Sequence, residues 1–147
     1  MRGIIVYDSQ TGNTEKVAKV FSQTTGFELT KVASAPTDLR GYDILVLGTL
    51  NIRGNATPKV QSYLQKAMLP SRVVVLITFG MPFWGPVSSW MCFSKLKKTS
   101  MFKGAKSFSC FMCPGYHIKY KTYSNRPSEQ DFSRARKFAQ NLINRVK

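Results

Sequence analysis

Acidic residues are scarce in this sequence of 147 residues: seven Asp and Glu stand against 22 Lys and Arg, for a formal net charge of +15. No acid at all lies between Ile44 and Ser128, although Lys and Arg recur throughout that interval. A field of this size attracts acidic partners and, without sequence specificity, nucleic acid or anionic membrane surfaces. It does not by itself indicate a fold.

Long apolar runs, cysteines and histidines are also few. No run approaches the roughly 18 apolar residues that span a bilayer, and the N-terminus lacks the apolar segment and cleavage site of a signal peptide, so we expect a cytoplasmic protein without a transmembrane segment. Three cysteines do not form a disulfide framework. We interpret the single histidine, His117, as a surface residue, and no general acid–base pair is visible. The length fits one domain, residues 1–147.

Two common phosphate-binding motifs are missing, the G-x-x-x-x-G-K-[ST] loop and the G-x-G-x-x-G fingerprint. Instead, the apolar run Ile4–Tyr7 is followed shortly by Ser9-Gln10-Thr11-Gly12-Asn13-Thr14 and then by helical periodicity from Val17. A strand, a hydroxyl-rich turn and a helix N-terminus in this order predict a phosphate site, because free backbone N–H groups and the helix dipole favour an anion. Hydroxyls and an amide add donors, and Gly12 permits close backbone approach.

The rest of the chain alternates strand and helix patterns. Strands are predicted at Phe27–Val32, Tyr42–Thr49, Arg72–Phe79 and Ala105–Cys113. A first helix is predicted after the first loop and ends at Gly26, and a second begins at Thr57-Pro58, with the inner residues Val60, Tyr63, Leu64, Ala67 and Met68. A third is predicted over Val87–Lys98, with Lys95, Lys97 and Lys98 at its C-terminus. The last begins at Ser128, and its apolar stripe consists of Phe132, Ala135, Phe138, Ala139, Leu142, Ile143 and Val146.

Shorter features complete this prediction. Ser128 and Asp131 have capping-box spacing, Arg145 and Lys147 lie in the last turn of the final helix, and one helical turn is expected around Asp38–Leu39. Five strands alternating with helical segments indicate an α/β protein with a doubly wound parallel sheet. The loops after the first, third and fourth strands, including Leu50–Ala56 and Phe79–Pro86, should then meet at one edge of the sheet.

The loop Ser9–Thr14 resembles the FMN-phosphate loop of the flavodoxin family, and Tyr42–Thr49 resembles the third strand of that family. The segment from Asn125 to Ala139 resembles its closing helix. The resemblance implies a flavodoxin-like five-stranded parallel sheet in the order 2-1-3-4-5, with helices on both faces. It also implies FMN as the cofactor. Flavodoxins tend to be acidic, so the basic charge of this chain departs from the family.

The resemblance also implies which residues bind FMN. Trp84 is the first choice for one wall of the ring site, with Phe83 or Trp90 as alternatives, and Leu50 or Ile52 forms the other wall. Thr49 and Asn51 are expected as polar contacts. The full predicted set is Ser9, Gln10, Thr11, Gly12, Asn13, Thr14, Thr49, Leu50, Asn51, Ile52, Gly54, Gly80, Phe83, Trp84 and Gly85.

The resemblance implies a one-electron carrier between redox proteins, since a flavin needs no catalytic side chains. The basic surface of this chain would steer it to partners with acidic docking surfaces. One alternative is a flavodoxin-type FMN oxidoreductase acting on a quinone or porphyrinogen. Another is an FMN-free basic module that binds nucleic acid or membrane, and an activator of ribonucleotide reductase shares the fold as well. We interpret the Lys95–Lys106 cluster as a solvated face and Cys110-x-x-Cys113 as packed residues, because residues three apart in a strand point to opposite faces.

Overall fold

The computed structural model describes residues 1–117 and 119–145. In this part of the chain, five strands and four α-helices alternate, with one short 3₁₀ helix, η1 (Val32–Ser34). The strands are β1 (Gly3–Tyr7), β2 (Glu28–Lys31), β3 (Ile44–Leu50), β4 (Arg72–Phe79) and β5 (Ser107–Pro114). The α-helices are α1 (Asn13–Thr25), α2 (Pro58–Lys66), α3 (Trp84–Phe102) and α4 (Glu129–Asn144). The sheet order β2-β1-β3-β4-β5, with every pair parallel, confirms the predicted fold.

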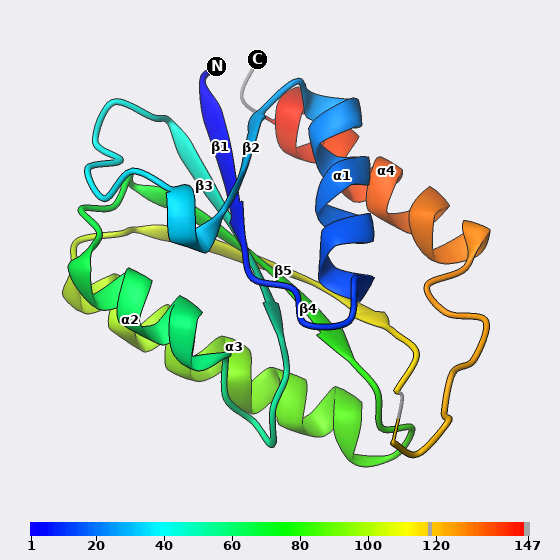
Figure 1. Ribbon diagram of the computed structural model, residues 1–147. Coiled ribbons are helices and arrows are strands. Elements are labelled where there is room, and N and C mark those ends of the chain that lie inside the picture. Colours follow the sequence, from blue (N-terminus) through cyan, green and yellow to red (C-terminus); the bar gives the residue numbers. More distant parts are fainter. Residues whose placement is uncertain (118, 146–147) are drawn as a thin grey trace.

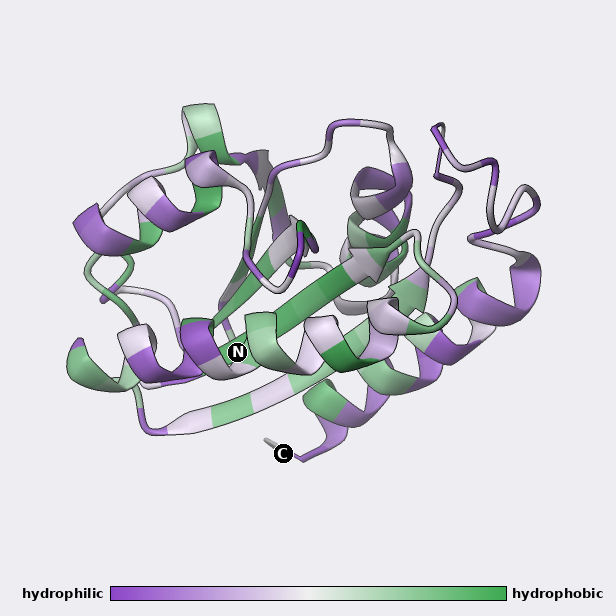
Figure 2. Ribbon diagram, turned by 90° about the horizontal axis from the view of Figure 1, so that it is seen from below, coloured by the Kyte–Doolittle hydropathy of each residue, from purple (hydrophilic) through white to green (hydrophobic). Residues whose placement is uncertain are grey.

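Helices cover both faces of the sheet. Figure 1 shows α1 and α4 on one face and α2 and α3 on the other. Successive residues of a strand point to opposite faces, so β1 sends Ile5 into the core under α1 and α4, and Ile4 and Val6 into the core over α2 and α3. The central strands are therefore apolar on both faces, which explains their uninterrupted apolar runs. Figure 2 shows this hydrophobic centre and the more hydrophilic outer helices.

The sheet positions a site at one edge. The carboxyl ends of the strands lie opposite the N-terminus (Figure 1). The chain leaves β1 toward α1 on one face and leaves β3 toward α2 on the other, so the neighbouring strands β1 and β3 form the topological switch point. Ligands of open α/β sheets bind outside the carboxyl ends at such a point.

Helix α3 differs from the prediction at both ends. It begins at Trp84, so the predicted loop through Pro86 and the predicted start at Val87 are wrong. Pro86 is compatible with this position because proline is tolerated in the first turn of a helix. The helix continues to Phe102. The prediction that Lys95, Lys97 and Lys98 lie at its C-terminus is therefore also wrong.

Helix α2 is shorter than predicted. It ends at Lys66, which leaves Met68 43% exposed instead of on the inner face. Thr57 occupies the N-cap position and Pro58 the first helical position, but the buried Thr57 hydroxyl makes no capping hydrogen bond. The prediction of a hydroxyl cap is therefore wrong, although the boundary is right.

Two smaller predictions have different outcomes. The helical turn expected at Asp38–Leu39 is absent from the described chain, and Asp38 instead pairs with Met68 in an isolated β-bridge. The predicted start of α4 is confirmed, since the Asp131 carboxylate accepts a 2.7 Å hydrogen bond from the Ser128 backbone N–H. Val146 and Lys147 lie outside the described residues.

Candidate functional site

A cavity of about 570 Å³ opens at the carboxyl edge of the sheet. Its lining comes from four segments: the loop after β1, the end of β3, the loop that leads from β4 into α3, and the chain after β5. A second hollow of about 310 Å³ shares several of these residues and extends to Thr11 and Asn13. The size is typical of small-molecule sites. The first loop and Trp84 therefore border two adjoining hollows that share lining residues.

The loop after β1 leaves its hydroxyl hydrogens free. The backbone N–H of Gly12 donates to Ser9 Oγ at 3.0 Å, and Asn13 Nδ2 donates to Thr11 Oγ1 at 3.1 Å. Each hydroxyl oxygen thus already accepts a hydrogen bond from within the loop. Its own hydrogen remains available to donate to a ligand.

Backbone donors at the start of α1 add to these hydroxyls. Gly12, the N-cap residue, has φ 89°, a left-handed conformation that glycine adopts without strain. The first backbone bond of the helix runs from Lys16 N–H to the Gly12 carbonyl, and no described residue accepts from the N–H groups of Asn13, Thr14 or Glu15. Unpaired N–H groups at the positive end of a helix dipole are a general anion site.

The side chains of Asn13 and Thr14 are buried and hold the loop in place. Asn13 Nδ2 also donates to the Tyr116 carbonyl at 3.0 Å, so both of its hydrogens are used within the protein. Thr14 Oγ1 lies 2.8 Å from Thr78 Oγ1 on β4. Both side chains therefore connect the loop to distant parts of the fold.

The only acid in the first turn of α1 is held by neighbouring side chains. A hydrogen bond from the Tyr7 hydroxyl, 3.1 Å long, and the nearby Lys19 ammonium lower the pKa of Glu15. The carboxylate is therefore negative, and Lys19, 3.6 Å away, compensates its charge. This pairing keeps the helix terminus suitable for an additional anion.

A tight turn shapes the cavity wall after β3. Ile52 and Asn55 exchange both backbone hydrogen bonds, and Arg53 and Gly54 between them have positive φ angles, as a type I′ turn requires. Asn51 accepts from Gly54 N–H at 2.9 Å and donates to Ser88 of α3 at 2.7 Å. The turn is thereby fixed against α3.

The predicted residues of this segment divide into two groups. Leu50, Asn51 and Ile52 line the cavity. Thr49 is fully buried and bonds to the Leu50 carbonyl and the Thr57 N–H, so it supports the loop from behind. Gly54 does not line the cavity, and its conformation serves the turn.

After β4, the structure brings three of the four predicted residues to the cavity: Gly80, Trp84 and Gly85. Trp84 is 72% exposed, so most of its indole surface is free to be covered. Phe83 is 87% exposed and does not line the cavity. The alternative Trp90 lies farther along α3, where it packs against Phe93.

At two glycines of the cavity wall, aromatic side chains pack directly against the backbone. A Cβ at Gly80 would lie 2.7 Å from the His117 side chain, and a Cβ at Gly85 would lie 2.5 Å from the Phe79 ring. Neither glycine has a positive φ. Their role is therefore to let the cavity walls pack closely.

The chain after β5 also contributes to the site, which the sequence patterns did not indicate. His117, Lys119 and Tyr120 line the cavity. The His117 and Tyr120 rings are 4.8 Å apart, and His117 Nδ1 accepts a hydrogen bond from Tyr120 N–H at 3.2 Å. The predicted topology could have indicated this contribution, because β5 ends at the same edge as the other parallel strands. Ile118 between these residues lies outside the described part.

The described lining of the two hollows carries no Asp or Glu, while Arg53 and Lys119 contribute positive charge. No group of three or more His, Cys, Asp or Glu side chains that could hold a metal ion occurs in residues 1–117 and 119–145. This donor set suits an anionic organic ligand with an aromatic part. The free amides, the free hydroxyl hydrogens and the exposed indole together fit FMN, whose phosphate and ring need such contacts.

The cysteines do not form a redox pair. Cys113 packs in the core under α1 and α4, whereas Cys110 packs toward α2 and α3, as the strand spacing predicts. Burial raises the pKa of the thiols of Cys92, Cys110 and Cys113 to about 12. Thiols with such a pKa are protonated near neutral pH and are weak nucleophiles.

Comparison with known proteins identifies the family of this site. The family model described as a flavodoxin domain matches residues 4–117. Flavodoxin 1 from Bacillus cereus is similar in structure, with a TM-score of 0.71, 14% identity and coverage of 98% of each chain. No curated protein sequence matches the chain.

Two other solved structures are similar. The NAD(P)H:quinone oxidoreductase from Methanothermobacter marburgensis gives a TM-score of 0.72 at 14% identity, covering 97% of this chain and 96% of that one. General stress protein 14 from Treponema denticola, solved in complex with FMN, gives 0.67 at 11% identity with both chains fully covered. At these identities the likeness establishes the fold.

Proposed function

Since the chain belongs to the flavodoxin-domain family, we propose that it binds FMN and carries single electrons between redox proteins. The observation that carries this proposal is the row of unpaired N–H groups at the start of α1, which lies beside a cavity with an exposed indole. Bound FMN supplies the redox chemistry, and the protein supplies position and electrostatics. We further propose that residues 1–147 act as one cytoplasmic domain.

The phosphate of FMN would be held by the first loop. The N–H groups of Asn13, Thr14 and Glu15 and the hydroxyls of Ser9 and Thr11 donate to it, and Gly12 allows its close approach. In this proposal Asn13 and Thr14 contribute backbone groups, while their side chains keep the loop in place. Gln10 lies where the phosphate end meets the main cavity, because it lines both hollows.

The ring of FMN would lie in the larger hollow. Trp84 forms one wall, and the other is formed by Leu50 and Ile52. Gly80 and Gly85 let the His117 and Phe79 rings pack closely in the cavity wall, and Asn51 fixes the turn at its side. Lys119 adds positive charge, which favours the uptake of an electron by a ligand in this cavity.

Redox partners with acidic docking surfaces fit the mouth of the cavity. Phe83 and Val87 are exposed next to Trp84, and the acid-free stretch from Ile44 to Ser128 contains both ring loops. An apolar centre with a basic surround suits transient docking and steers an acidic protein toward it. No helix in the described chain is long and apolar enough to cross a membrane.

A second candidate function is an FMN oxidoreductase that acts on a quinone or porphyrinogen. The observation in its favour is His117 in the cavity wall, 4.8 Å from the Tyr120 ring, because an imidazole beside the ring site can exchange protons with a substrate. A carrier would pass electrons only to a partner protein, whereas an oxidoreductase would turn over a quinone with NAD(P)H alone.

The test is reconstitution of the purified protein with FMN. We expect the visible spectrum of FMN to shift on binding and the flavin fluorescence to be quenched by the indole. The double variant Ser9→Ala/Thr11→Ala should weaken binding by about tenfold or more through two lost hydrogen bonds, while Thr30→Ala on β2 should bind as the parent does. Failure to bind FMN, together with salt-sensitive binding to DNA or anionic vesicles, would support the FMN-free module instead.

A further inference from the structure

The outer edge of β5 is long and carries no protecting charge. The other edge strand, β2, has four residues with Glu28 and Lys31 at its ends, whereas β5 has eight residues and no charged side chain. Proteins usually protect an exposed edge with charges, bulges or short strands, because its free N–H and C=O groups pair readily with another chain. The two edges of this sheet are therefore not equivalent.

Alternate residues of β5 turn their backbone groups outward. Ser107 N–H donates to the Ser71 carbonyl at 3.0 Å and Gly115 N–H donates to the Phe79 carbonyl at 2.8 Å, so the odd-numbered residues face β4. The N–H and C=O groups of Phe108, Cys110 and Met112 consequently face away from the sheet. In the described chain, only Arg134 reaches this row, by a 3.3 Å bond from Nη2 to the Met112 carbonyl.

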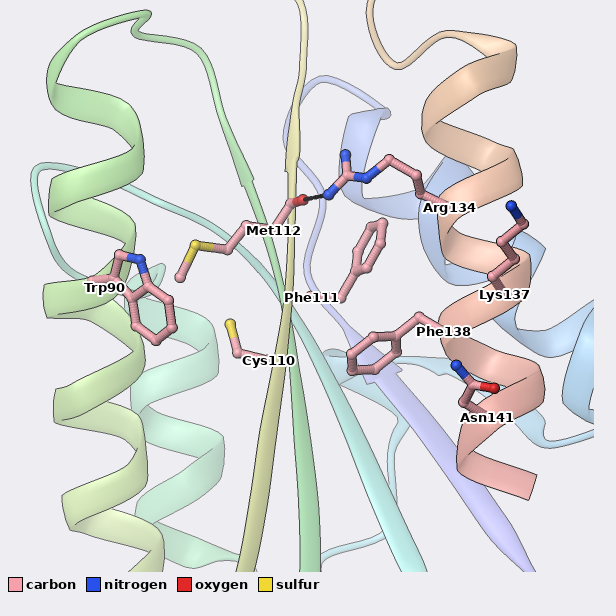
Figure 3. A pocket seen from close by; sticks show the side chains of 8 residues that line it. All are labelled: Trp90, Cys110, Phe111, Met112, Arg134, Lys137, Phe138 and Asn141. Carbon is pink, nitrogen blue, oxygen red and sulfur yellow. Dashed lines mark hydrogen bonds between the residues drawn. The ribbon is translucent and has the colours of Figure 1, made fainter. Parts of the chain in front are cut away.

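Side chains from α3 and α4 extend past this edge and form a hollow of about 430 Å³, which we call the β5 slot. Figure 3 shows Trp90 and Met112 on the α3 side of the strand, and Arg134, Lys137 and Phe138 on the α4 side. The α3 side is apolar, and the rim on the α4 side is basic. The slot thus has two chemically different walls with a free strand edge between them.

We propose that the β5 slot binds an extended acidic segment of a partner protein, which adds to the sheet as a sixth strand. Side chains of an added strand alternate between the two faces. Apolar residues would therefore face Trp90, and acidic residues would face Arg134 and Lys137. This is β-augmentation with a defined sequence pattern, in which apolar and acidic residues alternate.

Charge decides which occupant the slot takes. A second copy of this chain would bring its own net charge of +15 to the same edge, which opposes close pairing of two β5 strands. An acidic segment is attracted instead. Arg134 Nη1 lies 3.6 Å from the Asp131 carboxylate, but the Arg134 side chain is 57% exposed, so Nη2 is able to exchange its long bond to the Met112 carbonyl for a partner carboxylate. The slot therefore favours an acidic partner over self-association.

This inference is independent of the FMN proposal, because none of its contacts involves the cavity. The two regions are nevertheless close along one helix. Trp84 lines the cavity and Trp90 lines the slot, six residues or about 9 Å apart along α3. A partner held in the slot would stay near the cavity mouth, which raises its local concentration there.

Fluorescence anisotropy measures the binding of a labelled peptide to the protein. The peptide has the length of β5, and Val and Glu alternate along it. Two further peptides carry backbone N-methyl groups, one on every Val and the other on every Glu. Each set blocks only one edge of the added strand. We expect one N-methylated peptide to lose about tenfold or more in affinity and the other to keep its binding. Equal binding of all three peptides would overturn strand addition.

Charge variants test the basic rim. The double variant Arg134→Glu/Lys137→Glu should bind the Val-Glu peptide with an affinity about tenfold or more lower, and it should bind a Val-Lys peptide more tightly. The double reversal Lys59→Glu/Lys98→Glu changes the net charge by the same amount at exposed positions on α2 and α3 that do not line the slot; it is the matched control and should change binding by less than about twofold. Similar losses in both proteins would show a general charge effect and overturn the site. A dimer joined through β5 in sedimentation would overturn the choice of occupant.

Discussion

The side-chain amide of Asn13 donates a 3.0 Å hydrogen bond to the backbone carbonyl of Tyr116. These residues lie 103 positions apart in the sequence, and the bond joins the loop after β1 to the segment after β5. A Cβ on the neighbouring Gly115 would lie 2.6 Å from the same amide, so the two segments are in close contact. The phosphate loop is therefore held in part by residues far from it in the chain.

Replacing Asn13 with alanine tests this connection. The carbonyl of Tyr116 and the hydroxyl of Thr11 would lose a donor, so we expect the free energy of unfolding to fall by about 1–3 kcal/mol. The affinity for FMN should fall as well, because the loop that holds the phosphate would be less ordered. Denaturant unfolding and FMN titration measure the two effects. Thr30→Ala on the edge strand β2, away from the cavity, is the control and should leave FMN binding unchanged. An N13A protein that binds FMN like the parent would contradict the prediction.

Gly80→Ala should narrow the cavity. The new methyl group would lie 2.7 Å from the His117 ring, so the ring or the backbone has to move. We expect weaker FMN binding with a stability loss of about 1–3 kcal/mol from overpacking. Gly41→Ala is a matched control, because its Cβ meets only the end of Arg2 at 3.6 Å. FMN titration of both variants compares them, and an unchanged affinity in G80A would show that the cavity does not hold the ring.

The strands of the sheet could be predicted because their signals were local, whereas their order followed from the resemblance to the flavodoxin family. The apolar runs of β3 and β4 have few polar breaks, and the S-x-T-G-N-T loop follows β1 directly. The ends of α3 could not be predicted from Phe79–Pro86, since glycine and proline there indicate a loop. The structure instead places Pro86 in the first helical turn, where proline is tolerated.

The walls of the site were harder to predict than the fold. Thr49 and Asn51 have the polarity of ligand contacts, but Thr49 is bonded to the Leu50 carbonyl and the Thr57 N–H, and Asn51 to Gly54 and Ser88. Which hydrogen bonds a side chain uses internally depends on tertiary contacts that a sequence pattern does not contain. The same holds for His117, whose place in the cavity depends on its contact with Gly80.

The stability of the protein should fall at low pH through Asp131. Burial acts to raise the pKa of this carboxyl, but hydrogen bonds from Arg126 and Ser128 outweigh it, so the pKa lies below the ordinary 3.8. Because the folded pKa is the lower one, the stabilisation is present above about pH 4 and is lost as pH falls through the folded pKa. Asp131→Asn should lower the free energy of unfolding at pH 7 by about 1–3 kcal/mol and flatten its acid dependence.

The control for Asp131 is Glu129→Gln in the same helical turn. Glu129 is exposed and pairs with Arg136 at the surface, so its loss should change stability by less than about 1 kcal/mol. Urea unfolding across the acidic range measures both variants. An equal acid dependence in D131N and the parent would assign the acid sensitivity to other carboxylates.

The thiols should be unreactive in the folded protein. Burial holds the pKa of Cys92, Cys110 and Cys113 at about 12, so little thiolate forms even in mildly alkaline buffer. We expect a thiol-specific chromogenic reagent to label none of them quickly in native protein and all of them in denaturant. Rapid labelling of Cys110, which is partly exposed and lines the β5 slot, would contradict this prediction.

Lys119 should set the reduction potential of bound FMN. It is exposed and lines a cavity whose described lining has no carboxylate, so its charge favours the addition of an electron. We expect Lys119→Gln to make the potential more negative by an amount on the order of tens of millivolts at low salt, and less at high salt, where the charge is screened. Lys98→Gln removes the same charge from the outer face of α3 and should shift the potential much less. Potentiometric titration at two salt concentrations separates the cases, because a general effect of net charge would move both variants equally, whereas a local effect moves only the variant at the cavity.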